Sequence, residues 1–126
     1  MLCNMSMPTR GDAQKVVVAD DDDLLSEVLE RALDSRGYEV VCAPDGIISA
    51  DIVANANLVI LDAHIPGADF VSTLRSLRAA GIAVLVLSGE LSPPDGVLAE
   101  QYLGKPVELN RLLDAVARLA TTTRAA

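Results

Sequence analysis

The chain reads KVVVADDDD from Lys15 to Asp23. The valines before Ala19 form an apolar, β-branched run without polar alternation, which is typical of a strand covered on both faces of a parallel sheet. From Leu24 onward the apolar residues recur every three or four positions, which predicts an amphipathic helix that Gly37 ends. A buried strand, an acidic turn and a helix form the first half of a βαβ unit.

This alternation continues along the chain. Further strands are predicted over residues 38–43, 58–61, 82–87 and 101–104, and further helices over 47–54, from 70 to near Gly81, and over 107–120. The pattern predicts an α/β fold, a doubly wound five-stranded parallel sheet with helices on both faces. Pro93 and Pro94 allow at most a short or irregular fourth helix in residues 90–100. We expect a flexible segment over 1–13, one domain over 14–120 and a tail over 121–126.

The amino-acid composition excludes several classes of function. The 126 residues are 51% apolar, enough for one core, and the net charge is −8. With only two lysines and three aromatic residues, the chain lacks the basic patches and stacking platforms of nucleic-acid-binding proteins. The two cysteines fit a reducing compartment, and no stretch resembles a signal peptide or a membrane span. These features predict a soluble cytoplasmic protein.

Polar residues follow four of the predicted strands. Asp20 and Asp21 follow the first, Asp62 the third, Ser88 the fourth, and Lys105 stands just beyond the fifth. Parallel strands place their carboxyl ends at one edge of the sheet, so these side chains are expected to lie together. Clustered carboxylates repel one another unless a cation neutralises them, and Mg²⁺ prefers oxygen ligands. The set therefore indicates a Mg²⁺ site suited to phosphoryl transfer, with an aspartate as a possible acceptor.

Four motifs resemble the receiver domain of two-component response regulators, in order, over about residues 14 to 120. They are VVVADDD at 16–22, LVILDAHIPG at 58–67, VLVLSG at 84–89 and YLGKP at 102–106. The resemblance implies a flavodoxin-like sheet with strand order 2-1-3-4-5. It also implies a stand-alone phosphorylation switch without an output domain of its own, which signals by binding another protein.

The resemblance also implies roles for the acidic residues. Asp62 would be the phosphoacceptor, and its donor would be the phosphohistidine of a sensor histidine kinase or a histidine phosphotransfer protein. Asp20 and Asp21 would hold Mg²⁺ together with Asp62, and the backbone carbonyl of Ala63 would be a further ligand. The chain would not be an enzyme in the usual sense, since its only catalysis would be slow Mg²⁺-dependent autodephosphorylation.

Four more residues receive roles in the same way. Ser88 matches the hydroxyl that turns toward the phosphoryl group, and Lys105 matches the lysine that pairs with it. Tyr102 matches the aromatic residue whose conformation follows the switch. Pro106 matches the proline that follows the lysine through a cis peptide bond.

Some features depart from the family pattern. Ile65 stands where a methionine is common, and the intervals from Asp62 to Ser88 and from Ser88 to Lys105 are each a few residues short. The second shortening falls on the usual output face of receivers. An alternative is therefore a phosphorylation-independent pseudo-receiver that binds a partner through an altered face.

The position two residues after Asp62 bears on a third possibility, a phosphatase with an aspartate nucleophile. Such an enzyme would need an acid at this position, where the chain has His64. We expect His64 to be an exposed polar residue and no ligand, and we expect Arg75 and Arg78 to lie solvated on a helix face. The remaining acids of the tetrapeptide, Asp22 and Asp23, are predicted to begin the first helix.

Overall fold

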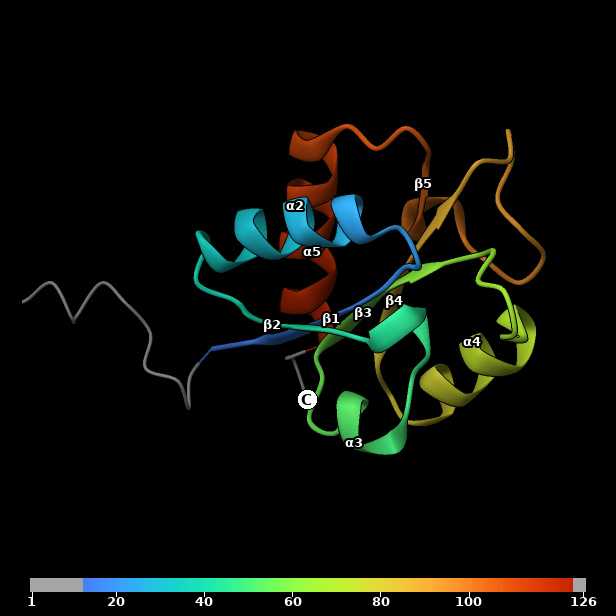
Figure 1. The fold of residues 1–126 in the computed structure, drawn as a ribbon, viewed down its shortest axis with the longest axis horizontal. Helices are drawn as coiled ribbons and strands as arrows, with labels where there is room; N and C mark the ends of the chain where they lie inside the picture. Colours follow the sequence, from blue (N-terminus) through green and yellow to red (C-terminus); the bar gives the residue numbers. More distant parts are fainter. Residues whose placement is uncertain (1–12, 124–126) are drawn as a thin grey trace, which may run out of the picture.

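A computed structural model describes residues 13–123 and places a five-stranded parallel sheet at the centre of the molecule (Figure 1). The strand order is β2-β1-β3-β4-β5, and every neighbouring pair is parallel. The predicted flavodoxin-like α/β fold is therefore confirmed. The strands are β1 (Lys15–Ala19), β2 (Glu39–Cys42), β3 (Leu58–Asp62), β4 (Ala83–Ser88) and β5 (Tyr102–Gly104).

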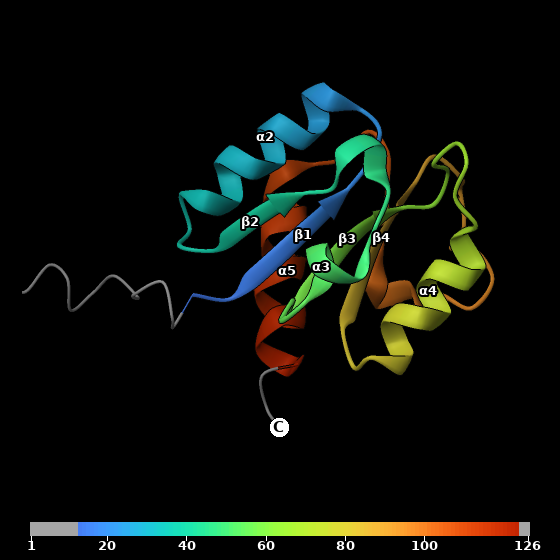
Figure 2. The ribbon, with the colours of Figure 1, turned by 60° about the horizontal axis from the view of Figure 1, so that its bottom comes forward.

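Helices cover the two faces of the sheet. Helices α2 (Asp23–Asp34) and α5 (Leu109–Thr123) lie on one face, and α3 (Ala50–Val53) and α4 (Phe70–Ala79) lie on the other (Figures 1 and 2). Alternate residues of β1 divide between the two cores: Val16 and Val18 pack toward α2 and α5, whereas Val17 and Ala19 pack toward α4. Residues 16–19 are fully buried because both faces are covered, which is why this strand has no polar alternation.

Local signals set the ends of α2 as predicted. The Asp22 side chain caps the helix by accepting hydrogen bonds from the backbone N–H groups of Leu24 and Leu25, and Asp23 is the first helical residue. At the other end Gly37 adopts a positive φ of 91°, which a glycine reaches without steric cost. The strand-to-helix turn therefore divides the four aspartates: the first two stay with the strand end, and the last two begin the helix.

Helix α3 is shorter than predicted. The expected helix over 47–54 is reduced to Ala50–Val53, because the Ser49 hydroxyl caps it by accepting from the Ile52 N–H at 3.4 Å. Ile47 therefore lies before the helix, in extended backbone. Residues 44–46 form a single 3₁₀ turn.

The connection between β4 and β5 has no α-helix. It contains bends and turns, and then one 3₁₀ turn over Ala99–Gln101, so the prediction of a short or irregular fourth helix is confirmed. Arg78 of α4 donates to the carbonyl of Gly96 at 2.6 Å and to Oε1 of Gln101 at 3.1 Å. Arg78 is exposed on the helix face as expected, and its guanidinium also binds this connection.

The ends of the described chain lie side by side. The Gln14 amide donates to the Ala120 carbonyl at 3.2 Å, which joins the start of β1 to the last turns of α5. Helix α5 runs to Thr123, three residues past the end of the predicted helix. The rest of the predicted flexible segment and tail, residues 1–12 and 124–126, lies outside the described residues. Within 13–123, none of the helices has the length and apolar character needed to cross a membrane.

Candidate functional site

The carboxyl ends of the strands bring the predicted site residues to one edge of the sheet. Asp20 follows β1 directly, Asp62 ends β3, Ser88 ends β4, and Lys105 follows β5. Neighbouring strands hold these positions in register: Asp62 lies beside Leu87, and the Lys105 N–H donates to the Ser88 carbonyl at 2.8 Å. Residues separated by up to 85 positions in sequence thus meet through the sheet alone.

Three carboxylates form the centre of the site. Asp20, Asp21 and Asp62 each offer one oxygen, and these oxygens all lie within 4.8 Å of one another. Asp20 and Asp62 are buried, whereas Asp21 is exposed. The Asp22 N–H donates to Asp20 Oδ1 at 2.9 Å, and the His64 N–H donates to Asp62 Oδ1 at 3.0 Å. Backbone hydrogen bonds therefore fix the orientation of both buried carboxylates.

Lys105 is the cation that the structure places in this cluster. Its Nζ lies 3.0 Å from Asp20 Oδ2 and 3.2 Å from Asp62 Oδ2. Burial alone would lower the pKa of Lys105, but the ion pairs with the Asp20 and Asp62 carboxylates outweigh it and raise that pKa. The lysine is therefore held as an ammonium between the two buried carboxylates.

One ammonium does not satisfy three carboxylates. Burial raises the pKa of Asp20, and the Asp22 N–H and the Lys105 ammonium offset only part of that effect. The contact of Asp20 Oδ2 with Lys105 has ion-pair distance but not hydrogen-bond geometry, and this buried oxygen accepts no hydrogen bond within residues 13–123. A buried carboxylate oxygen without a donor, beside two more carboxylates, fits a hard divalent cation such as Mg²⁺.

Ser88 begins a chain of contacts that leads away from the carboxylates. Its side chain is fully buried, and its Oγ accepts from the Glu90 N–H at 3.1 Å. The half-buried Tyr102 donates its hydroxyl hydrogen to the carbonyl of the same Glu90. The Glu90 carboxylate lies 3.4 Å from His64 Nε2. The end of β4, the loop after β3 and β5 are thus connected through Glu90.

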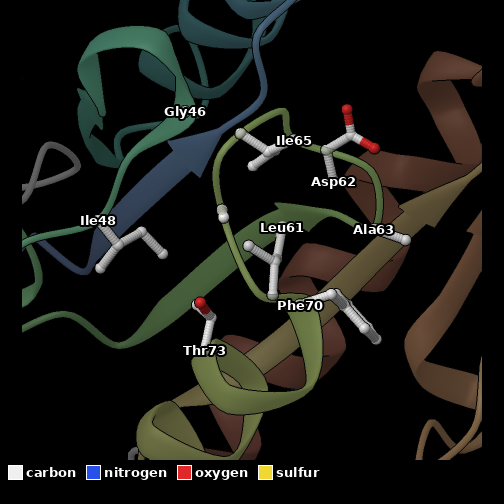
Figure 3. A pocket seen from close by; sticks show the side chains of 9 residues that line it. Gly46, Ile48, Leu61, Asp62, Ala63, Ile65, Phe70 and Thr73 are labelled. Atoms are coloured by element: carbon white, nitrogen blue, oxygen red, sulfur yellow. The ribbon is translucent and has the colours of Figure 1, made fainter.

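Below the carboxylates lies a small cavity of about 20 Å³, which is room for about one water molecule. Its lining includes Leu61, Ile65, Phe70 and Thr73, and Figure 3 shows the Asp62 carboxylate turned away from Thr73. An organic cofactor does not fit there. Asp62 is also part of the lining, but its carboxylate oxygens point away from Thr73 (Figure 3).

Two residues that support the site, Glu90 and Gly46, are not among the predicted site residues. Glu90 receives no role from the sequence, because no local pattern distinguishes it from other loop acids. Gly46 likewise receives no role from the sequence, yet a Cβ there would lie 3.3 Å from backbone atoms of Asp20 and Asp21. The Pro-Asp-Gly turn after the second strand is the available signal for this close approach. His64 is exposed as expected, although it pairs with Glu90.

The cis peptide bond expected before Pro106 is present between Lys105 and Pro106.

Comparison with known proteins identifies the family of this chain. The family model described as the response regulator receiver domain matches residues 16–117. The chain belongs to the response regulator receiver family. Receiver domains take part in two-component signalling, bind Mg²⁺ at an acidic pocket, and interact with histidine kinases or phosphotransfer partners.

Individual relatives are similar over most of this chain. The response regulator MprA of Mycobacterium sp. is 35% identical over 86% of the chain, and the sensory/regulatory protein RpfC of Xanthomonas campestris pv. campestris is 34% identical over 89%. The chain spans 51% and 17% of their respective lengths. Among solved structures, the receiver domain of Francisella response regulator 1452 is 27% identical, with a TM-score of 0.72 over 87% of this chain and 98% of that one.

Proposed function

We propose that this receiver domain is a phosphorylation-dependent switch that accepts a phosphoryl group on Asp62. The donor is the phosphohistidine of a sensor histidine kinase or a histidine phosphotransfer protein. The observation that carries the proposal is the position of the Lys105 ammonium, 3.0 Å from Asp20 and 3.2 Å from Asp62, beside a third carboxylate. A merely structural strand end has no need for three carboxylates around one lysine.

In the transfer step, a carboxylate oxygen of Asp62 attacks the phosphorus of the phosphohistidine. The new P–O bond forms as the P–N bond breaks, and the electron pair of that bond leaves with the imidazole of the donor. Lys105 is placed to pair with an oxygen of the arriving phosphoryl group. Phosphoryl transfer depends mostly on such positioning and charge neutralisation.

Asp20, Asp21 and Asp62, with the Ala63 carbonyl, would hold Mg²⁺. When bound, the ion supplies positive charge that offsets the negative charge of the phosphoryl oxygens. Asp20 Oδ2 supports this assignment, because it is buried and accepts no hydrogen bond within residues 13–123, although Lys105 Nζ lies 3.0 Å away. Later attack of water on phosphorus would break the new P–O bond and restore Asp62, so the catalysis expected of the protein itself is slow autodephosphorylation.

The switch would begin at Ser88. Its hydroxyl now accepts from the Glu90 N–H, and a phosphoryl group on Asp62 offers that hydroxyl an acceptor at the neighbouring strand end. Turning toward it breaks the contact with Glu90, whose carbonyl holds the Tyr102 hydroxyl. Phosphorylation would thereby bias two arrangements of the β4–β5 connection, and the signal would pass to a partner protein.

Intact-mass spectrometry tests the proposal. The protein is incubated with Mg²⁺ and acetyl phosphate, and we expect the mass of one phosphoryl group to be added. Asp62→Asn is expected to abolish the addition, whereas Asp34→Asn, which changes an exposed acid at the far end of α2, should leave it intact. A folded wild-type protein that gains no mass would favour the phosphorylation-independent pseudo-receiver.

A phosphatase with an aspartate nucleophile is less well supported than the phosphorylation switch. The position two residues after Asp62 is occupied by His64, whose Nε2 is engaged with Glu90 at 3.4 Å. Turnover of an aryl phosphate far above one equivalent per protein would revive it, and we expect release to stop at about the stoichiometric level.

A further inference from the structure

A second hollow lies next to the phosphorylation site, between the start of α4 and the β4–β5 connection. It has a volume of about 600 Å³, with residues 63–64 and 68–71 on one side and residues 90 and 92–95 on the other. We call it the acidic groove. Its volume lies in the range of sites that hold ligands or partner side chains.

The groove is a preformed part of the fold. Its outer wall is the connection that lacks an α-helix, and two hydrogen bonds from Arg78 hold that wall at Gly96 and Gln101. Its inner wall is the capped start of α4, where the Asp69 side chain accepts from the Ser72 N–H at 3.2 Å. Both sides of the groove are therefore held by hydrogen bonds before a partner binds.

The acidic groove is lined by apolar and acidic side chains. Asp69, Glu90 and Asp95 contribute three carboxylates. The lining has no lysine or arginine, and its one histidine, His64, lies 3.4 Å from the Glu90 carboxylate. The apolar part comes from residues 70–71 and 93–94, and Val71 leaves 49% of its surface exposed. Leu91, in the same connection, is fully exposed. Apolar side chains left in water beside carboxylates are typical of a surface that binds a complementary partner.

We propose that the acidic groove docks a segment of a partner protein in which apolar side chains alternate with lysine or arginine. The apolar side chains would cover Val71 and its neighbours, and the basic groups would pair with Asp69 and Asp95. A second copy of this chain is a poor occupant, because its net charge is −8. The groove differs from the three-carboxylate site and has a different ligand class.

The groove is also placed to sense phosphorylation, a step that rests on the proposed function. Ala63 and His64 in its wall directly follow Asp62, and the Glu90 N–H contacts the Ser88 hydroxyl. Conversion of the Asp62 carboxylate into an acyl phosphate replaces one negative charge by up to about two, a gain of about one negative charge at pH 7. We therefore expect phosphorylation to strengthen the binding of a basic segment.

The probe is a synthetic peptide of repeated Leu-Lys-Lys-Leu units, compared with a peptide in which glutamate replaces lysine. Binding to the full chain is followed by NMR shift mapping and fluorescence anisotropy. Shifts should cluster at residues 68–71 and 90–95, and the glutamate peptide should not bind. Shifts that cluster elsewhere, for example on α2, or no binding at all, would overturn the proposal.

Matched charge variants separate the groove from general attraction to an acidic protein. Asp69→Asn with Asp95→Asn and, as control, Asp34→Asn with Asp114→Asn each change the net charge from −8 to −6. Asparagine keeps the cap at position 69. The groove pair should weaken binding at least tenfold and the control pair less than twofold. Equal weakening by both pairs would show that no specific groove exists.

Separate measurements test the phosphorylation of Asp62 and the docking of a partner in the acidic groove. Absence of added mass on acetyl phosphate treatment, together with groove-specific peptide binding, would refute the switch and support the docking site. Added mass at Asp62 without peptide binding at the groove would refute the docking site alone.

Discussion

Replacing Asp20 by asparagine is expected to stabilise the metal-free fold and to remove its response to Mg²⁺. Asp20 leaves only 3% of its surface exposed, and burial raises the pKa of its carboxyl group. Asparagine has nearly the same shape and keeps an oxygen for the Asp22 N–H. Lys105 retains Asp62 as its partner at 3.2 Å, so the substitution leaves no buried ammonium without a counter-charge.

The expected gain in stability of Asp20→Asn can be estimated from the distances between the charged groups of the site. With an effective dielectric constant of about 20, a carboxylate pair at the 4.8 Å limit of the cluster repels by about 3.5 kcal/mol. The ammonium at 3.0 Å from Asp20 attracts by about 5.5 kcal/mol on the same basis. Two repulsions exceed this attraction by about 1.5 kcal/mol. Solvent screening at the exposed Asp21 reduces the excess, and burial of Asp20 adds to it, so we expect a gain of about 1–2 kcal/mol.

Thermal unfolding with and without Mg²⁺ measures both effects. For a domain of this size, 1 kcal/mol corresponds to about 4 °C in Tm. We expect Asp20→Asn to melt about 4–8 °C above the wild type without metal. Mg²⁺ at ten times its Kd should stabilise only the wild type, by about 1.4 kcal/mol. Asp34→Asn is the control, and it should change neither value.

The stability advantage of Asp20→Asn over the wild type should change with pH in one direction. Because the folded-state pKa of Asp20 lies above its unfolded value, ionisation of Asp20 lowers stability as the pH rises through that interval. The advantage of Asp20→Asn should therefore be full at neutral pH and should shrink as the pH falls and the wild-type carboxyl takes up a proton. A variant less stable than the wild type at pH 7 without metal, or one equally stabilised by Mg²⁺, would refute the reasoning.

Three further predictions concern the surroundings of the site. Gly46→Ala should cost about 1–3 kcal/mol in thermal unfolding, because φ is 75° and the new Cβ would lie 3.0 Å from Ile65 Cδ1; an unchanged Tm would contradict this. Arg78→Ala should increase hydrogen exchange in residues 96–101, whereas Arg75→Ala, on the same helix with an exposed side chain, should not; equal protection in both variants would count against the bracing role. Burial and the nearby charge of Glu30 raise the pKa of Cys42, so iodoacetamide should modify this thiol more slowly at pH 8 than it modifies free cysteine, as followed by peptide mass mapping; an equal rate would exclude the shift.

The fold and the centre of the site are predictable because they depend on rules that act along the strands. Buried β-branched runs mark β1 and β3, and the strand-end rule places Asp20, Asp62 and Ser88 together without any knowledge of their contacts. The Asp22 cap and Gly37 likewise act within a few residues of α2. Each of these features is legible in a short stretch of sequence.

The rest depends on contacts between distant residues. The path of the β4–β5 connection is fixed by Arg78, which lies 18 positions before Gly96 and 23 before Gln101. An exposed arginine on an amphipathic helix carries no local sign of such a partner. The link from Ser88 through Glu90 to Tyr102 is of the same kind. The shortening of α3 is a local matter, since Ser49 is recognisable as a cap.

The pairing of Gln14 with Ala120 has a practical consequence for handling the protein. It places the start of β1 and the last turns of α5 at the edge of the sheet opposite the carboxylates. A strand of five residues spans roughly 16 Å, so a dye or a surface anchor attached beside Gln14 starts about that far from Asp62. Immobilised beside Gln14 or Ala120, the domain would present its three carboxylates to the solution, which is the orientation that a test of phosphoryl transfer requires.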